Sequence, residues 1–248
     1  ISLYHVLEEK GREPQYDGYV ESFTENWEKL ERYDNNAPKT MNAHLHVLEA
    51  YTLLYQCWKD NGLKKRLEFC VDLFINRIYD PSRRHFNLFF DNEWNSLVEM
   101  DSYGHDVETG WLLCEAARTL ENQDLIEQTN QLALDVTGAC LAEGMSDKGY
   151  MIYEKKGDRK TKHASWWGQI ETVIACVNAW QISVSDVYLQ SVDTVWTFVK
   201  DHMVDKEYGE WYSDCFDGEP KKEAPKVSMW RCPYHTVRLG VEMYNRLK

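Results

Sequence analysis

An internal repeat runs through this sequence of 248 residues and restricts the folds open to it. Short segments of alternating aromatic and polar residues recur along the chain, and each is followed by two longer stretches with a helical apolar period. Markers in these segments lie 68, 64 and 59 positions apart, at Gly18, Phe86, Tyr150 and Gly209. Repeats of this length form open solenoids or closed toroids of inner and outer helices. We therefore expect an all-α fold of about four helix pairs with short β-hairpins between them.

Periodicity and terminating residues set the expected helix boundaries. A short first helix is expected over Ile1–Glu9, ended by Gly11 and Pro14. The longer helices are expected at Met41–Lys59, Leu63–Tyr79, Asp106–Leu120, Leu125–Glu143, Ser165–Gln181, Asp186–His202 and Ser228–Leu247. The hairpins are expected at Asp17–Phe23, His85–Phe90, Gly149–Glu154 and Tyr208–Ser213. Because the chain opens within a helix, we expect it to be a piece of a longer protein.

Charge and composition argue against several classes of function. Asp and Glu number 41 against 28 Lys and Arg, so the formal net charge is −13. This balance disfavours binding to nucleic acid or to an anionic membrane surface, and no apolar run is long enough for a membrane helix. Aromatic residues make up 13% of the chain, which argues against disorder. Seven cysteines without a CxxC pair are expected to be free thiols, so we expect a cytoplasmic protein. We also expect the protein to be a monomer.

The repeats align at the first helix of each pair. The aligned tetrapeptides are His46–Glu49, His105–Glu108, Gly168–Glu171 and His235–Arg238, spaced by 59, 63 and 67 residues. Three of the four begin with His, three end with Glu, and the last ends with Arg. Residues i and i+3 share a helix face. In a toroid these positions would point inward at one height, so we expect a ring of imidazoles and carboxylates at one end of a central cavity.

Other readings of these histidines are open. A single helical His is more often structural than catalytic, and His44 must point to a different helix face from His46. The remaining histidines match no repeat register and are expected to be surface or packing residues: His5, His85, His163 and His202. His with Glu at i+3 also resembles a dimetal carboxylate site, but the third repeat offers only Gly168 at the His position. We therefore expect no metal site.

Three tryptophans lie at or just before the expected helix starts, close to the proposed ring. They are Trp166, Trp167 and Trp230, and an indole there could stack on the apolar face of a sugar. The chain has no phosphate-binding glycine motif and no GxSxG nucleophile elbow. We therefore expect His and carboxylate side chains to carry out the chemistry without a cofactor. Two facing imidazoles suit epimerisation next to a carbonyl, while paired carboxylates would suit glycoside hydrolysis.

Four sequence blocks resemble the motifs of cellobiose 2-epimerases, within the N-acylglucosamine 2-epimerase superfamily. The first is NAPKTMNAHLHVLEAY at 36–51, and the second is SYGHDVETGWLL at 102–113. The third is WWGQIE at 166–171, and the fourth is WRCPYH at 230–235. The resemblance extends from about residue 15 to the C-terminus. The first and last blocks favour the disaccharide epimerases over the N-acylglucosamine branch.

The resemblance implies an (α/α)6 barrel and reversible epimerisation at C2 of a reducing-end glucose. Cellobiose would give glucosyl-mannose, and lactose would give epilactose, through an enediolate. His105 and His235 correspond to the two acid/base residues, and His46 to a residue that aids ring opening. The residues that correspond to substrate contacts are Asn42, Glu108, Trp166 or Trp167, and Trp230.

The resemblance also implies that members of the family contain six helix pairs, two more than this chain. We therefore expect residues 1–248 to form a single domain, the C-terminal two-thirds of the barrel. The absent part would supply an Arg for the enediolate oxygen, so we expect the chain alone to have little or no activity. Two alternatives stay open: an aldose–ketose isomerase like mannose isomerase, and a sugar-binding remnant without catalysis. A hydrolase is the least favoured reading.

Overall fold

The structure is a computed structural model that describes residues 1–30, 33 and 36–248. Its residues group into two compact units. The first contains residues 1–101 and 112–129, and the second contains residues 102–111 and 130–248. The expectation of a single domain stays a prediction.

The first unit is built around a helical hairpin. Helix α2 (Met41–Cys57) packs against α3 (Asn61–Leu73), and the Thr40 and Asp60 side chains cap their N-termini. Caps of this kind satisfy backbone N–H groups that the first helical turn leaves unpaired. The apolar residues on the facing sides are fully buried, among them Leu45, Leu48, Leu63, Leu67 and Val71. Both helices were expected, and both are confirmed within a few residues.

Short strands join the elements of the first unit. Strand β1 (Lys39–Thr40) pairs antiparallel with β4 (Phe89–Phe90), and β2 (Tyr79–Asp80) pairs with β3 (His85–Phe86). A further strand, β5 (Met100–Asp101), ends the contiguous part of the unit. The segment expected to form a hairpin at His85–Phe90 contains β3 and β4, but these strands pair with β2 and β1 and not with each other, so the hairpin lies earlier, at residues 79–86.

The hairpin expected at Asp17–Phe23 is wrong in detail. This segment makes only isolated bridges, Arg12 with Tyr19 and Phe23 with Lys29. The chain turns instead at Gly18, where φ is +89°. A Cβ at Gly18 would lie 2.4 Å from the Trp94 ring, so the turn requires glycine for both conformation and space.

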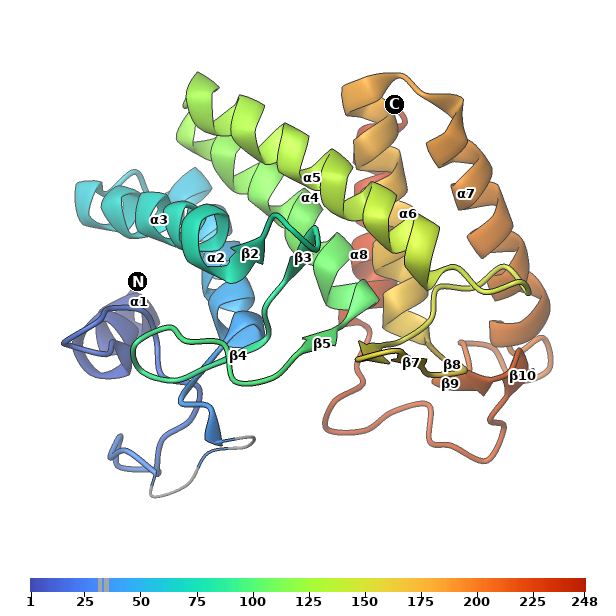
Figure 1. Cartoon of the computed structure of the whole chain (residues 1–248), viewed down its shortest axis with the longest axis horizontal. Coiled ribbons are helices and arrows are strands. Elements are labelled where there is room, and N and C mark those ends of the chain that lie inside the picture. The colour runs from blue at the N-terminus through green and yellow to red at the C-terminus, as the bar shows by residue number, and fades with distance from the viewer. Residues whose placement is uncertain (31–32, 34–35) are drawn as a thin grey trace. The chain divides into compact units, whose positions relative to one another are not determined.

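Helix α6 (Trp166–Ser183) is the central element of the second unit. It packs against α7 (Asp186–Phe198) and α8 (Tyr234–Arg246), and Figure 1 shows α7 running beside it. Residues 168–179 of α6 are buried without interruption. A helix that is buried on all sides occupies an enclosed position, and the polar side chains buried in this stretch, such as Glu171, are held by hydrogen bonds. Helices α4 (Tyr103–Leu120) and α5 (Gln123–Gly144) each contribute residues to both units.

The strands of the second unit form a hairpin and a small sheet. Strands β6 (Lys155–Lys156) and β7 (Arg159–Lys160) make the hairpin. Strand β9 (Asp214–Phe216) lies between β8 (His163–Ser165) and β10 (Glu219–Pro220), antiparallel to both.

The two hairpins expected at Gly149–Glu154 and Tyr208–Ser213 are shifted. Each of these segments makes one isolated bridge, Met145 with Met151 and Val204 with Trp211. The paired strands begin a few residues later. Alternation located the irregular regions but did not identify which residues pair, because pairing depends on where the chain can turn.

The last expected helix, Ser228–Leu247, begins too early. Helix α8 starts at Tyr234, and Pro233 occupies its N-cap position. Proline disfavours helical backbone in the residue before it, which excludes Cys232 from the helix. Ser228 and Arg231 close a separate short turn instead. Trp230 therefore lies in a turn rather than on a helix.

The internal repeat is visible in the way three helices end. Helix α1 (Ser2–Val6), α3 and α7 each continue into a five-residue π-helical turn, at Leu7–Gly11, Phe74–Ile78 and Val199–Met203. Each π turn ends at a residue with extended backbone. Equivalent helices thus end alike, as a repeat requires. Among the described residues, no helix is both long enough and apolar enough to cross a membrane.

Buried His44 gives the first unit a predicted dependence of stability on pH. Its Nδ1 lies 2.6 Å from the Thr40 carbonyl oxygen, and its Nε2 accepts the Tyr19 backbone N–H at 2.8 Å. The Nε2 contact requires the neutral ring, whereas Nδ1 can donate to the carbonyl oxygen in either protonation state. Burial lowers the pKa of His44 from 6.5 to about 4.

The folded protein therefore resists protonation of His44 more than the unfolded chain does. The contribution of neutral His44 to the free energy of unfolding is fully present above pH 6.5 and is lost as the pH falls toward 4. We expect a loss of about 2 kcal/mol between pH 7 and pH 5. Urea denaturation at both pH values would measure it, with His44→Gln as the control. An equal loss in the variant would contradict the assignment to His44.

Candidate active site

Two of the sequence-predicted histidines lie on one tryptophan in the second unit. His105 is in the first turn of α4, His235 is the second residue of α8, and Trp167 is the second residue of α6. The His105 and Trp167 ring centroids are 4.6 Å apart. His235 stacks on Trp167 with centroids 5.7 Å apart and an interplanar angle of 29°. Three helix N-termini thus bring together residues that are 62 and 68 positions apart in the sequence.

Two glycines allow α4 and α6 to approach at this point. A Cβ on Gly104 would lie 2.7 Å from the Trp167 ring and 3.2 Å from the Gly168 Cα atom. Ser165 caps α6 by accepting the Gly168 N–H at 3.2 Å, which sets where the helix begins. Gly168 is the residue at which the third repeat departs from the His pattern. Its role is close helix packing next to Trp167.

We expect Gly104→Ala to displace Trp167 and impair the site. The added methyl group must move either the indole or the α6 backbone, and shifts of about 1 Å can cost about 10²-fold in rate. Steady-state kinetics and thermal unfolding would measure the effect. The matched control is Gly138→Ala on α5, where no atom lies within 4 Å of the added Cβ. Equal kinetics in the two variants would contradict this prediction.

The two histidines differ in the side chain that contacts Nδ1. The Ser102 hydroxyl lies 2.8 Å from His105 Nδ1, a neutral contact. The Glu171 carboxylate lies 2.7 Å from His235 Nδ1. A carboxylate on Nδ1 selects the tautomer that bears its proton there and leaves Nε2 as the basic nitrogen of a neutral His235. The carboxylate also stabilises the imidazolium that His235 would form on taking up a proton.

Glu171 belongs to a buried ion network that the sequence analysis did not predict, although the repeat alignment placed Glu171 in the expected ring. Its Oε1 is 3.0 Å from Arg238, and its Oε2 accepts the Trp111 indole N–H at 2.9 Å. Arg238 also donates to Glu108 at 2.6 Å. Glu108, Glu171 and Arg238 are the aligned i+3 positions of three repeats. The change of sign from Glu to Arg at the last position was the signal that could have predicted their pairing.

The structure separates the three tryptophans. Trp167 contacts both histidines, whereas Trp166 packs on the core of Tyr150, Ala164, Phe198, Val199, Met203 and Cys215. The Trp166 ring is edge-on to His235 at 6.3 Å and carries the Arg231 guanidinium 5.0 Å from its centre. Trp230 is 83% exposed in the turn before α8. The structure therefore brings Trp167 into the histidine cluster and leaves Trp230 at the surface.

Two of the predicted site residues belong to the first unit. Asn42 and His46 lie in the first two turns of α2. The His46 side chain is 44% exposed, and its Nδ1 lies 3.2 Å from Glu49. His44 is fully buried, so it points to a different face from His46, as expected.

One group in the second unit has the residue types of a metal site. Glu108, Glu171 and His235 offer ligand atoms that lie within 4.8 Å of one another. Arg238 already donates hydrogen bonds to both carboxylates. A divalent cation there would have to displace the guanidinium, so the geometry favours an ion-pair network over a metal centre.

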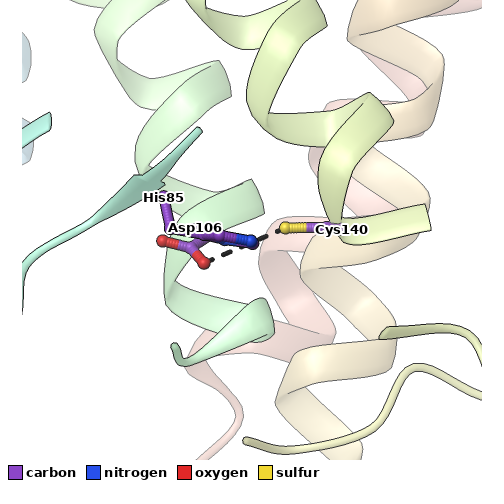
Figure 2. A group of neighbouring side chains, drawn as sticks. All are labelled: His85, Asp106 and Cys140. Carbon is purple, nitrogen blue, oxygen red and sulfur yellow. Dashed lines mark hydrogen bonds between the residues drawn. The ribbon is translucent and has the colours of Figure 1, made fainter. Parts of the chain in front are cut away.

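A second polar contact in this unit involves a thiol. Figure 2 shows Cys140 of α5 and Asp106 of α4, and the Cys140 thiol donates to the Asp106 carboxylate at 3.9 Å. Both residues are fully buried. A buried thiol that is engaged in this way is typical of a structural cysteine, in accord with the free thiols expected from the sequence.

The helical hairpins of the two units are of the kind from which (α/α) toroids are built. The N-acylglucosamine 2-epimerase (GlcNAc 2-epimerase) family model matches residues 2–238. The chain therefore belongs to this family.

The relatives are consistent with this assignment. The chain is 38% identical to the cellobiose 2-epimerase of Bacteroides fragilis, covering 98% of this chain and 64% of the relative. It is 34% identical to that of Dictyoglomus turgidum, again over 64% of the relative. The structure of cellobiose 2-epimerase from Bacillus thermoamylovorans B4167 matches 99% of this chain with a TM-score of 0.94 and 34% identity. These comparisons confirm the expected fold class, and the chain spans 64% of the length of these relatives.

Proposed function

We propose that this chain carries the two acid/base histidines of a carbohydrate 2-epimerase, and that its substrates are β-1,4-linked disaccharides with a reducing-end glucose. The observation that carries this proposal is the placement of His105 and His235 on one indole, each with Nδ1 engaged by a neighbouring side chain. In each histidine a neighbouring side chain thus fixes the orientation of the imidazole ring. The similarity to cellobiose 2-epimerases supports the choice of substrate.

The reaction needs two proton transfers at one carbon. In an opened sugar the C2 proton is acidified by the neighbouring aldehyde, so an imidazole can remove it and leave an enediolate. The opposite face of C2 then receives a proton from the second imidazole, which completes the inversion. Imidazole suits both steps because its pKa is near neutral pH. In the first unit, His46 is proposed to aid ring opening and Asn42 to hold the sugar.

The carboxylate and the tryptophans have different proposed roles. Glu108 is proposed to contact a sugar hydroxyl from its place in the ion network. Trp167 would form an apolar wall beside the reacting carbon, since it already packs against both histidines. The exposed indole of Trp230 is available to stack on a sugar at the surface.

Product analysis in D₂O tests the proposal. The gene product that contains these 248 residues is incubated with cellobiose, and the products are resolved by chromatography and NMR. A product with mannose at the reducing end and deuterium at C2 is the expected result. A ketose would point instead to an aldose–ketose isomerase that uses the same enediolate. Binding of cellobiose without turnover would leave a sugar-binding protein.

A further inference from the structure

One guanidinium nitrogen of Arg238 serves two buried carboxylates. Its NH1 lies 2.6 Å from Glu108 Oε1 on α4 and 3.0 Å from Glu171 Oε1 on α6. The side chains of Glu108 and Glu171 are 2% and 0% exposed, and that of Arg238 is 8% exposed. The three charges therefore interact with little screening by water.

The aromatic side chains around Arg238 hold it in place. Its guanidinium lies 4.2 Å from the centre of the Tyr234 ring and 5.3 Å from that of Trp111. The Trp111 indole N–H also donates to Glu171, so it fixes the carboxylate and packs on the cation that pairs with it. The network is thus rigid and closed on the sides that these rings cover.

Two carboxylates at this separation depend on the cation. Buried carboxylates within a few ångströms of each other do not both ionise, because each charge raises the free energy of the other. The positive charge of Arg238 offsets this repulsion, and its guanidinium stays protonated. Without Arg238, one carboxylate would take up a proton and change from an acceptor into a donor.

His235 is coupled to the same network through a shared oxygen. Glu171 Oε1 accepts from His235 Nδ1 at 2.7 Å and from Arg238 at 3.0 Å. The positive charge of Arg238 thus offsets part of the negative charge of Glu171, which would otherwise stabilise the His235 imidazolium more strongly. The charged groups that face His235 are Glu108 from α4, Glu171 from α6 and Arg238 from its own helix.

We propose that Arg238 is a positioning residue that keeps Glu108 and Glu171 ionised together and sets the protonation at which His235 works. The proposal rests on the proposed function only in taking His235 as an acid/base residue.

Arg238→Gln tests the proposal through the pH profile. Loss of the cation returns the full charge of Glu171 to His235 and leaves one carboxylate free to protonate. Both effects raise the pH at which kcat/KM falls on the acid limb of its profile, by about one pH unit or more. Activity at pH 6 should then fall about tenfold or more and recover at higher pH. Arg238→Lys keeps the charge and should restore most of the wild-type profile.

A matched control separates this effect from a loss of stability. Arg246 lies two turns further along α8, where it pairs with Glu242 and Asn178. Arg246→Gln is expected to lower the melting temperature and leave the acid limb in place. An acid limb that does not move in Arg238→Gln, or that moves equally in Arg246→Gln, would overturn the proposal.

NMR titration of the His235 imidazole gives a readout that does not need turnover. The resonance is assigned by its absence in His235→Asn. Its midpoint is expected to rise in Arg238→Gln and to fall in Glu108→Gln, where Arg238 is left to Glu171 alone. If Arg238→Gln does not fold, the Glu108→Gln titration decides, and an unchanged midpoint contradicts the proposal. Failure of all forms to epimerise cellobiose would overturn the proposed function instead, while the titration still tests Arg238.

Discussion

Replacement of His235 by asparagine is expected to lower kcat for 2-epimerisation by roughly 10²–10⁴-fold, the usual contribution of a general acid/base residue. Asparagine can still donate a hydrogen bond to Glu171, so the ion network should persist. It cannot exchange a proton with C2 of the sugar. The effect should therefore fall on kcat much more than on KM, and steady-state kinetics with cellobiose would measure it.

Isotope exchange makes this prediction sharper. If the two histidines serve opposite faces of C2, the remaining His105 can still remove a proton and return it to the same face. In D₂O, His235→Asn should then label one epimer at C2 without converting it, and His105→Asn should label the other. Labelling of the same epimer by both variants would rule out the assignment of one histidine to each face.

A histidine outside the cluster supplies the matched control. His202 stacks on Phe198, with ring centroids 4.8 Å apart, in the π turn that follows α7. His202→Asn is expected to leave kcat within about twofold of the wild-type value, since the half-buried His202 ring stacks on Phe198 and not on Trp167 or the other two histidines. Full turnover by His235→Asn would mean that the catalytic assignment is wrong.

Replacement of Arg66 by methionine is expected to lower the free energy of unfolding by about 2–3 kcal/mol. This is less than the cost of removing one partner of a fully buried ion pair, because the side chains of Arg66, Glu8 and Asp17 stay 12%, 16% and 31% exposed. Arg66 on α3 lies 3.1 Å from Glu8 and makes two hydrogen bonds of 3.1 Å to Asp17. It also donates to the Tyr19 hydroxyl at 3.0 Å. Its removal leaves partly buried carboxylates without this cation. Urea denaturation followed by circular dichroism would measure the loss.

The same helix provides an exposed ion pair as the control. Lys64 and Glu68 are both more than 40% exposed, and their charged atoms are 3.8 Å apart. Exposed pairs of this kind contribute about 0–1 kcal/mol. Lys64→Met should therefore change stability by less than about 1 kcal/mol. Similar losses in the two variants would show that the Arg66 network contributes no more than a surface pair.

Local sequence determined where most helices lie. The apolar period was enough to place α2 and α3 within a few residues, and the caps at Thr40 and Asp60 that the structure shows are consistent with those starts. These signals act over one or two turns, so they can be read without knowing the fold. The repeat alignment also singled out His105 and His235, because equivalent positions in a repeat occupy equivalent places.

The failures of sequence reasoning occur where the outcome depends on a turn or a distant partner. Helix α8 begins at Tyr234 rather than Ser228 because Pro233 excludes the preceding residue from the helix. That signal was present and was outweighed by the apolar pattern. The expected hairpins at Gly149–Glu154 and Tyr208–Ser213 were misplaced because alternation alone does not select the residues that pair.

Only the tertiary structure decided how the candidate site is held together. Trp166 and Trp167 are adjacent and chemically identical. The close approach of α4 and α6 at Gly104 brings the Trp167 indole, and not that of Trp166, against His105. The tertiary structure also joined Arg238 to Glu108, a pair 130 residues apart in the sequence. Side-chain identity and spacing determine which residues share a helix face. Which charges meet depends on how helices from different repeats pack, and no local property of the sequence reports that.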